Sequence, residues 1–188
     1  GDMARYKEIS KKYIAAYEMD MESLNCLKPQ HQPRVTEMIP EITKFIEGLI
    51  DKGAAYEKEG SVYFRVTTFP GYGKLSGQNI KELRSGARIE IEKCKEDPLD
   101  FAVGKRDDKV GLDSPWGQGR PGWHIECSAM AQEIFQDTVD MHGSGMDLIF
   151  PHHENEIAQS ESLYERPFVD YWLHNAFGNI NKEKMSKS

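Results

Sequence analysis

Residues 122–156 carry a cysteine, a histidine and a glutamate whose spacing predicts a metal site. Cys127 lies in the segment GWHIECSAM, while His152 and Glu156 lie in PHHENEIAQ. Because residues four apart share one face of a helix, His152 and Glu156 can point at one ion. A thiolate, an imidazole and a carboxylate suit zinc better than magnesium or calcium, although cobalt or iron could take the same ligands. We take zinc as the working ion.

A structural explanation of the same residues stays open, because a cysteine at a helix start is usually a small buried hydrophobe and paired histidines are often surface residues. Clustering favours the metal site. Five of the six histidines fall between positions 124 and 174, namely His124, His142, His152, His153 and His174. The pattern leaves the roles of His124, His142, His153 and His174 undecided.

Composition limits the classes of function. The net charge of -7 argues against a strong nucleic-acid binder, so any such contact must be local or belong to other regions. Three widely spaced cysteines do not make a disulfide framework, which favours a reducing cytoplasm. No apolar run approaches the ~20 residues that span a bilayer. With 188 residues, we expect one compact domain plus a smaller insertion.

The first part of the chain, residues 1–53, is predicted to be a helical connecting segment. Apolar residues recur at three- and four-residue steps over residues 4–25, which predicts an amphipathic helix that packs. Two prolines then predict an extended connector. A second helix is predicted from Pro40, with Gly53 as its C-terminal stop.

Residues 54–115 are predicted to form a β-containing insertion. Residues 54–66 suggest two short strands around a turn, residues 80–86 a helical turn, and residues 87–94 a further strand. The glycine-rich, charged stretch 104–120 predicts a mobile loop.

Residues 116–188 alternate helix and strand. We expect helices from about Trp123 and Pro151, and strands over 138–142 and 169–180. This order predicts an α/β fold with parallel βαβ units, whose ligands bind beyond the carboxyl ends of the strands.

Two segments in this last part could meet a nucleotide. The turn Gly143-Ser144-Gly145 would let backbone approach closely, and Asp147 could accept hydrogen bonds from ribose hydroxyls, although such a turn is more often only a turn. The end of the chain, NKEKMSKS, carries Lys182, Lys184 and Lys187. Lysines on a mobile segment can stabilise charge on a triphosphate, but a solvated tail has the same composition.

Together these segments resemble cysteinyl-tRNA synthetase, a class I aminoacyl-tRNA synthetase. The matching motifs are GKLSGQ at 73–78, GWHIECSAM at 122–130, HGSGMDLIFPHHENEIAQSE at 142–161 and KMSKS at 184–188. KMSKS is shared by many class I enzymes, whereas GWHIEC followed by HHENEIAQS is far more specific. The resemblance implies the second half of a Rossmann-like nucleotide fold with a connective insertion.

The resemblance also implies roles for individual residues. Cys127, His152 and Glu156 would hold zinc, which binds the sulfur of substrate cysteine and so rejects serine, and Trp123 would line the same pocket. The turn with Gly143 and Gly145, together with Asp147, would face the ATP ribose. Lys184 and Lys187 would be the catalytic lysines on the triphosphate, with Lys187 in closer contact and magnesium accompanying ATP.

The implied reaction is activation of cysteine by ATP to cysteinyl-adenylate, then transfer to tRNA-Cys, by a cytoplasmic protein that we expect to be a monomer. The family's fourth zinc ligand, a cysteine, and its His-Xaa-Gly-His motif are missing, as is everything after KMSKS. We therefore expect a fragment that does not catalyse cysteine-dependent ATP–pyrophosphate exchange alone. Two rivals remain, a cysteine ligase of mycothiol synthesis that uses an amino-sugar acceptor, and a non-catalytic zinc-binding module.

Overall fold

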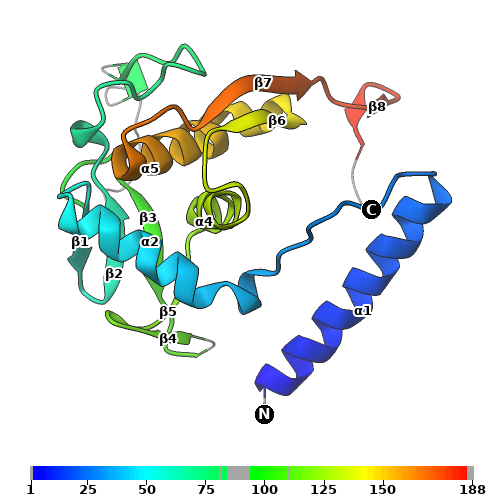
Figure 1. The fold of residues 1–188 in the computed structure, drawn as a ribbon, viewed down its shortest axis with the longest axis horizontal. Helices are drawn as coiled ribbons and strands as arrows, with labels where there is room; N and C mark the ends of the chain where they lie inside the picture. Colours follow the sequence, from blue (N-terminus) through cyan, green and yellow to red (C-terminus); the bar gives the residue numbers. More distant parts are fainter. Residues whose placement is uncertain (1, 81, 84–93, 110, 186–188) are drawn as a thin grey trace.

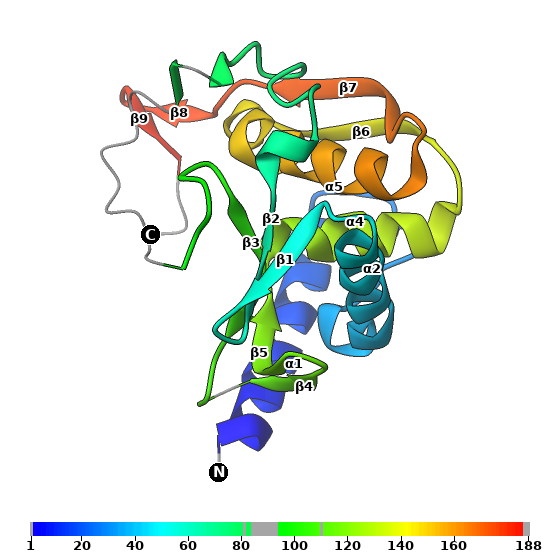
Figure 2. The same ribbon diagram turned by 90° about the vertical axis from the view of Figure 1, so that its left-hand side faces the viewer.

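The computed structural model describes residues 2–80, 82–83, 94–109 and 111–185. A five-stranded antiparallel sheet and a pair of parallel strands are held together by three packed helices, as Figures 1 and 2 show. The predicted α/β class is confirmed. Among the described residues, no helix is both long and apolar enough to cross a membrane.

The helix predicted from Pro40 is confirmed as α2, Ile39–Asp51. Proline is tolerated in the first turn because the amide hydrogen that it lacks would have no helical partner there. The apolar stripe is buried and consists of Ile42, Phe45, Ile46 and Leu49. After the helix the chain turns at Gly53, whose φ is +70°. The helix packs on α4, Trp123–Phe135, and on α5, Glu154–Tyr164.

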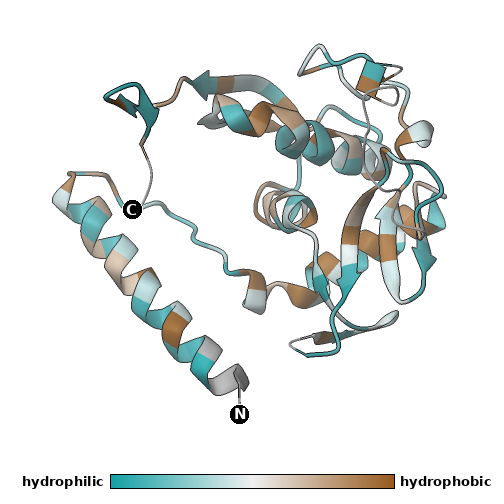
Figure 3. Cartoon of the chain, turned by 180° about the vertical axis from the view of Figure 1, so that it is seen from behind, coloured by the Kyte–Doolittle hydropathy of each residue, from teal (hydrophilic) through white to brown (hydrophobic). Residues whose placement is uncertain are grey.

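Helix α1, Asp2–Ser23, forms as predicted but stands apart from the rest of the molecule (Figures 1 and 3). We expected its apolar stripe to pack, and this expectation is wrong for the described side chains. Tyr13, Tyr17 and Leu24 are 66%, 55% and 67% exposed. The periodicity predicted the helix correctly, but in the part of the chain that the structure describes no helix or strand covers that face, and residues 29–34 of the connector border it.

The predicted pair of strands in 54–66 is confirmed as the hairpin of β1, Ala55–Lys58, and β2, Ser61–Phe64. These strands continue into a sheet of order β1-β2-β3-β5-β4. Its other members are β3, Phe101–Arg106, β4, Leu112–Ser114, and β5, Gly117–Pro121. Strand β5 therefore belongs to this sheet although it lies beyond residue 115.

The mobile loop predicted over 104–120 is wrong, because most of that stretch is strand. Ser114 closes the β4–β5 hairpin by donating its hydroxyl to the carbonyl of Gly117 at 2.7 Å. Gly117 has φ +108°, which favours glycine at the turn. The glycines that suggested mobility therefore serve a tight turn and close strand pairing.

Most of the segment predicted as helical turn and strand over 80–94 lies outside the described residues. Of it, residues 80, 82 and 83 are helical. Cys94 is half-buried and donates its thiol to a carboxylate oxygen of Glu59 at 3.0 Å.

The parallel βαβ unit predicted near the C-terminus is confirmed. Strand β6, Val139–Gly145, pairs in parallel with β7, Val169–Asn175, and α5 connects the two. Two details differ from prediction. Residues 143–145 are not a turn, since they extend β6 and pair with Leu173, His174 and Asn175. The strand expected over 169–180 ends at Asn175, and a small hairpin of β8, Asn179–Ile180, and β9, Glu183–Lys184, follows.

The hydrophobic core lies between the five-stranded sheet and the helices. Its buried members include Leu49, Phe64, Val103 and Ile125, all less than 2% exposed. A second cluster under the parallel strands contains Val139, Ile157, Phe168 and Val169. These two clusters hold α4 and α5 against each other, and both helices carry predicted metal ligands.

Candidate metal centre

The three predicted metal ligands come together in the structure. Cys127 lies in the first turns of α4, Glu156 in the first turn of α5, and His152 in the segment just before α5. Their ligand atoms all lie within 4.8 Å of one another. A separation of 25 residues between Cys127 and His152 is thus bridged by helix packing.

The helix predicted from about Pro151 is present, but its first turn is irregular. Residues Ile149–His153 form a π-type turn, and Phe150 is extended, with φ -136° and ψ 132°. The Phe150–Pro151 peptide is cis. Regular helix begins only at Glu154. The turn nevertheless keeps His152 on the face of Glu156, with Nε2 of the imidazole 2.6 Å from Oε1 of the carboxylate.

Glu156 is the centre of the site. Its side chain is fully buried, and its Oε2 lies 2.7 Å from Nε2 of His142. Its Oε1 has no partner with hydrogen-bond geometry among the described residues, despite its closeness to His152. Burial raises the pKa of Glu156, but contacts with His142 and His152 outweigh burial and hold that pKa below its usual range. A buried carboxylate oxygen that has no partner in hydrogen-bond geometry suits a cation.

Cys127 is half-buried, unlike an ordinary surface thiol. Burial raises its pKa to about 12, and the carboxylates of Glu156 and Glu126 act in the same direction. A neutral thiol is therefore the metal-free form at neutral pH. Binding of a divalent ion would reverse this preference, because a coordinating thiol loses its proton. Sulfur, nitrogen and oxygen donors at one point match the donor set that zinc accepts.

The other histidines of the predicted cluster surround these ligands. Nδ1 of His124 lies 2.8 Å from Nδ1 of His152, and Nδ1 of His153 lies 2.7 Å from Nε2 of His174. Burial lowers the pKa values of His124 and His153 to about 4, so both are neutral at neutral pH. A second group of potential ligands, His142, His153 and Glu156, also lies within 4.8 Å. Sequence reasoning did not anticipate that one carboxylate serves both groups.

Trp123 borders the site on its solvent side. Its ring centroid lies 4.3 Å from that of His152, and the side chain is 56% exposed. An exposed indole beside buried polar ligands is available to a small molecule. This position agrees with the predicted pocket-lining role but does not test it.

The glycines and the aspartate that were predicted to contact a nucleotide lie at the carboxyl ends of the parallel strands. Gly143 and Ser144 line an open pocket of about 430 Å³ with Leu173, His174 and Asn175. Gly145 ends β6, and Asp147 follows in a short 3-10 turn.

The structure also brings Asp147 and Lys184 together. The ammonium group of Lys184 donates to Oδ2 of Asp147 at 2.8 Å and lies 4.3 Å from the ring centroid of Phe177. The hydrogen bond from Lys184 holds the pKa of Asp147 below its usual range. Lys187 lies outside the described residues.

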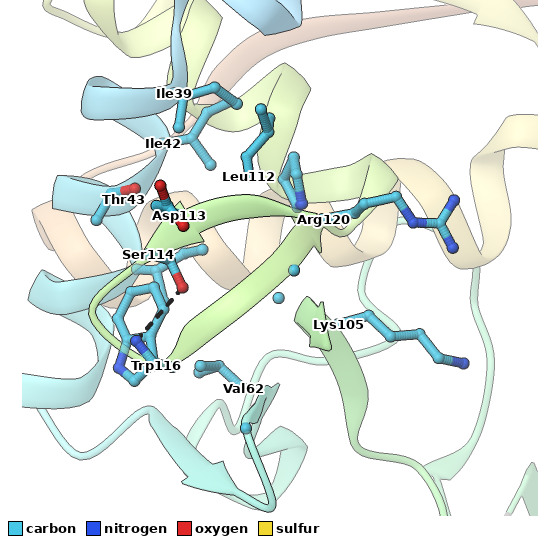
Figure 4. Close-up of a pocket in the computed structure, with 15 residues that line it drawn as sticks. Ile39, Ile42, Thr43, Val62, Lys105, Leu112, Asp113, Ser114, Trp116 and Arg120 are labelled. Carbon is cyan, nitrogen blue, oxygen red and sulfur yellow. Dashed lines mark hydrogen bonds between the residues drawn. The ribbon is translucent and has the colours of Figure 1, made fainter. Parts of the chain in front are cut away.

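A separate, partly open cavity of about 40 Å³ lies between α2 and the strands β3, β4 and β5 (Figure 4). Its walls include Ile39, Ile42, Val62 and Leu112. None of the predicted site residues lines it. Figure 4 shows Lys105 and Arg120 pointing away from this space. The cavity is therefore a packing feature of the insertion and not a part of the candidate site.

Glu154 is a buried acid that sequence reasoning missed. It is 0% exposed, and its carboxylate accepts backbone N–H groups from the segment 73–76. The only sequence signal was its place in HHENE beside a predicted ligand. Nothing in the pattern pointed to its partners, which lie about 80 residues earlier.

Comparison with known proteins places the chain in a class. Residues 2–188 match the family described as tRNA synthetases class I (C) catalytic domain, and the chain belongs to this family. A crystal structure assigned as an arginyl-tRNA synthetase from Campylobacter jejuni matches 85% of this chain and 28% of that one, with a TM-score of 0.50 and 12% identity. That likeness concerns the fold alone.

The similar curated proteins point to one member of this class, since they are named cysteine–tRNA ligases. The one from Geobacillus thermodenitrificans is 59% identical over 182 residues, and the one from Bacillus licheniformis is 58% identical over 182. The one from Geobacter sp. strain M21 is 53% identical over 189 residues. The first two cover 96% of this chain and the third 100%. This chain spans 39% of the length of each relative.

Proposed function

We propose that the chain is the metal-bearing part of a cysteine–tRNA ligase, in which Cys127, His152 and Glu156 hold zinc. The observation that carries the proposal is the buried Oε1 of Glu156, which has no partner in hydrogen-bond geometry among the described residues although an imidazole and a thiol lie beside it. The similarity to cysteine–tRNA ligases supports the same choice. When bound, zinc supplies a soft Lewis acid that prefers the sulfur of cysteine to the hydroxyl of serine.

The chain's own residues would form the cysteine pocket around that ion. Trp123 would cover the bound side chain with its exposed indole face, while His124 would keep the imidazole of His152 oriented. The role of His124 is supported by its 2.8 Å contact with His152, because a metal-bound imidazole is usually fixed through its other nitrogen. Discrimination would then need no separate editing site.

We place ATP at the carboxyl ends of β6 and β7. Gly143 and Gly145 would lie against the nucleotide, and Asp147 would accept hydrogen bonds from the ribose hydroxyls. Lys184 and Lys187 would stabilise the negative charge of the triphosphate, with magnesium accompanying ATP. The open pocket beside Gly143 and the position at a strand end support this placement.

In the whole enzyme the cysteine carboxylate would attack the α-phosphate of ATP, release pyrophosphate and pass the cysteinyl group to tRNA-Cys. Residues 1–53 would form the helical connecting segment. Residues 54–115 would form the insertion together with β5, and the rest of 116–188 would complete the nucleotide domain. We propose that the enzyme is cytoplasmic and acts as a monomer. No observation favours an amino-sugar acceptor or a non-catalytic zinc module.

The proposal is tested by the selectivity of the metal-loaded chain for thiol ligands. Cobalt replaces zinc as a coloured probe, and cysteine or serine is added to the loaded chain while the visible spectrum is recorded. We expect cysteine to change the cobalt spectrum with saturation and serine to leave it unchanged at the same concentration. A Trp123→Ala variant should bind cysteine more weakly but still bind cobalt. Equal responses to cysteine and serine would refute the assigned selectivity.

A further inference from the structure

The segment GKLSGQ, residues 73–78, takes no part in the proposed chemistry, yet buried side chains of α5 hold it tightly. Oε1 of Glu154 accepts the backbone N–H of Gly73 at 2.9 Å, and Oε2 accepts that of Ser76 at 2.8 Å. The N–H of Leu75 lies at 3.5 Å from Oε1. A fully buried carboxylate that accepts several backbone N–H groups makes strong, charge-assisted hydrogen bonds.

The loop that supplies these N–H groups is itself tight. Gly73 has φ +94°, and a Cβ at this position would lie 2.3 Å from the carbonyl oxygen of Gln78. The backbone N–H of Gly77 donates to the carbonyl of Gly73 at 2.9 Å. These contacts therefore stabilise the conformation in which the loop presents its amides to Glu154.

The next residue of α5 holds the same loop. Oδ1 of Asn155 accepts the hydroxyl of Tyr72, and both side chains are buried. The Tyr72 ring lies edge-on to Phe150, with centroids 6.3 Å apart. Phe150 stands two residues before the ligand His152. The loop thus contacts α5 and also the turn that carries His152.

A further chain of contacts runs from the loop to the other side of the site. The ring of Tyr72 stacks on that of Phe101, with centroids 6.4 Å apart. The rings of Phe101 and His124 are in turn perpendicular, with centroids 5.8 Å apart. His124 in turn contacts His152. Three consecutive residues at the start of α5 therefore act differently, since Glu154 and Asn155 hold the loop while Glu156 faces the metal site.

We propose that Glu154 is a positioning residue for the metal centre. By locking the segment 72–76 onto the first turn of α5, it fixes the rotation of that turn and the place of the preceding segment. Glu156 and His152 are thereby held at a common point before any ion binds, which is the preorganisation that a tight metal site requires. The inference rests on the proposed function, because it assigns the loop a task only if that point binds metal.

The test compares two variants that each remove one carboxylate between α5 and this loop. Glu154→Gln keeps the size of the side chain but replaces one acceptor oxygen by a donor that faces backbone N–H groups. The matched control is Glu161→Gln. Glu161 also binds the loop, through the exposed ammonium group of Lys74, and its other contact is the backbone N–H of Phe168 rather than a residue next to the ligands. Cobalt affinity is measured for the 188-residue chain by competition with a chelator, together with the visible spectrum and the hydrogen exchange of the loop amides.

We expect Glu154→Gln to weaken cobalt binding about tenfold, to change the cobalt spectrum and to speed the exchange of the Gly73 and Ser76 amides. The control should change cobalt affinity less than about twofold. Faster amide exchange in Glu154→Gln with an unchanged affinity and spectrum would overturn the inference, since it would make the contact purely structural. If the unsubstituted chain binds no cobalt through Cys127, the proposed function itself fails, which is a different result.

A milder variant covers the case in which Glu154→Gln does not fold. Tyr72→Phe removes only the hydroxyl that Asn155 accepts and keeps the ring contacts with Phe150 and Phe101. We expect about a threefold loss of cobalt affinity, the size of one buried hydrogen bond. An affinity equal to that of the unsubstituted chain would count against the positioning role.

Discussion

Gly122 joins β5 to α4 at a point where the backbone of β3 leaves no room for a side chain. Its N–H donates to the carbonyl of Val103 at 2.8 Å. A Cβ at this position would lie 2.2 Å from the carbonyl oxygen of Ala102 and 3.3 Å from Cα of Val103. Because these are backbone atoms, Gly122→Ala cannot be relieved by rotating a side chain. We predict that this substitution displaces the start of α4, which carries Trp123 and Cys127.

The magnitude follows from the geometry. Real Cβ atoms essentially never come within 3.0 Å of such an atom, so the 2.2 Å contact requires the two segments to separate by at least 0.8 Å. That shift stretches the hydrogen bond from Gly122 to Val103 out of range, which costs about 1 kcal/mol. Strain from overpacking adds about 1–3 kcal/mol. Together we expect a loss of about 2–4 kcal/mol in the free energy of unfolding.

The assay is urea unfolding of the metal-free chain followed by circular dichroism, with Gly143→Ala as the matched control. Gly143 lies in β6, and a Cβ there would meet its nearest atom, the carbonyl oxygen of Leu173, at 3.7 Å, an ordinary contact. We expect the control to change stability by less than about 0.5 kcal/mol. A Gly122→Ala chain that unfolds at the same urea concentration as the unsubstituted chain would refute the close approach of β3 and α4.

Two further predictions concern the thiols and the core. Because burial raises the pKa of Cys127 to about 12 while Cys26 is exposed, iodoacetamide at pH 8 should label Cys26 well before Cys127 in the folded, metal-free chain. The raised pKa of Cys127 stabilises the folded chain. This contribution to the free energy of unfolding is complete below about pH 9 and should be lost as the pH rises towards 12, which urea unfolding at several pH values would measure. Equal labelling rates would contradict the burial of Cys127. Leu49→Ala should lower the free energy of unfolding by about 2–5 kcal/mol, because Leu49 is 0% exposed, whereas Leu27→Ala at a 94% exposed position should have little effect. Similar losses for the two leucine variants would contradict the core that joins α2 to the ligand-bearing helices.

Much of the fold was predictable from local patterns. The helix from Pro40 carries its own start signal and a buried stripe, and the first hairpin has its turn in the sequence. The β4–β5 hairpin was missed because glycine serves both mobile loops and tight turns, and only the pairing partner distinguishes them. The extension of β6 through Gly145 was missed for a similar reason, since β7 supplies the hydrogen bonds.

The candidate site was likewise only partly predictable from the sequence. The i, i+4 spacing placed His152 and Glu156 on one face although the first turn of the helix is irregular, and the packing of α4 on α5 brings Cys127 to them. The role of Glu154 could not be predicted, because its stabilising partners are backbone amides of a distant loop. A buried charge is recognisable only when the groups that compensate it are known.

The central claim is that one ion is held jointly by Cys127, His152 and Glu156. The most direct measurement is the visible spectrum of the cobalt-loaded chain beside that of Cys127→Ser, with metal content determined for both. We predict one ion per chain and a sulfur-to-cobalt charge-transfer band that Cys127→Ser lacks. A cobalt spectrum without such a band in the unsubstituted chain, or with the same band in Cys127→Ser, would contradict the claim.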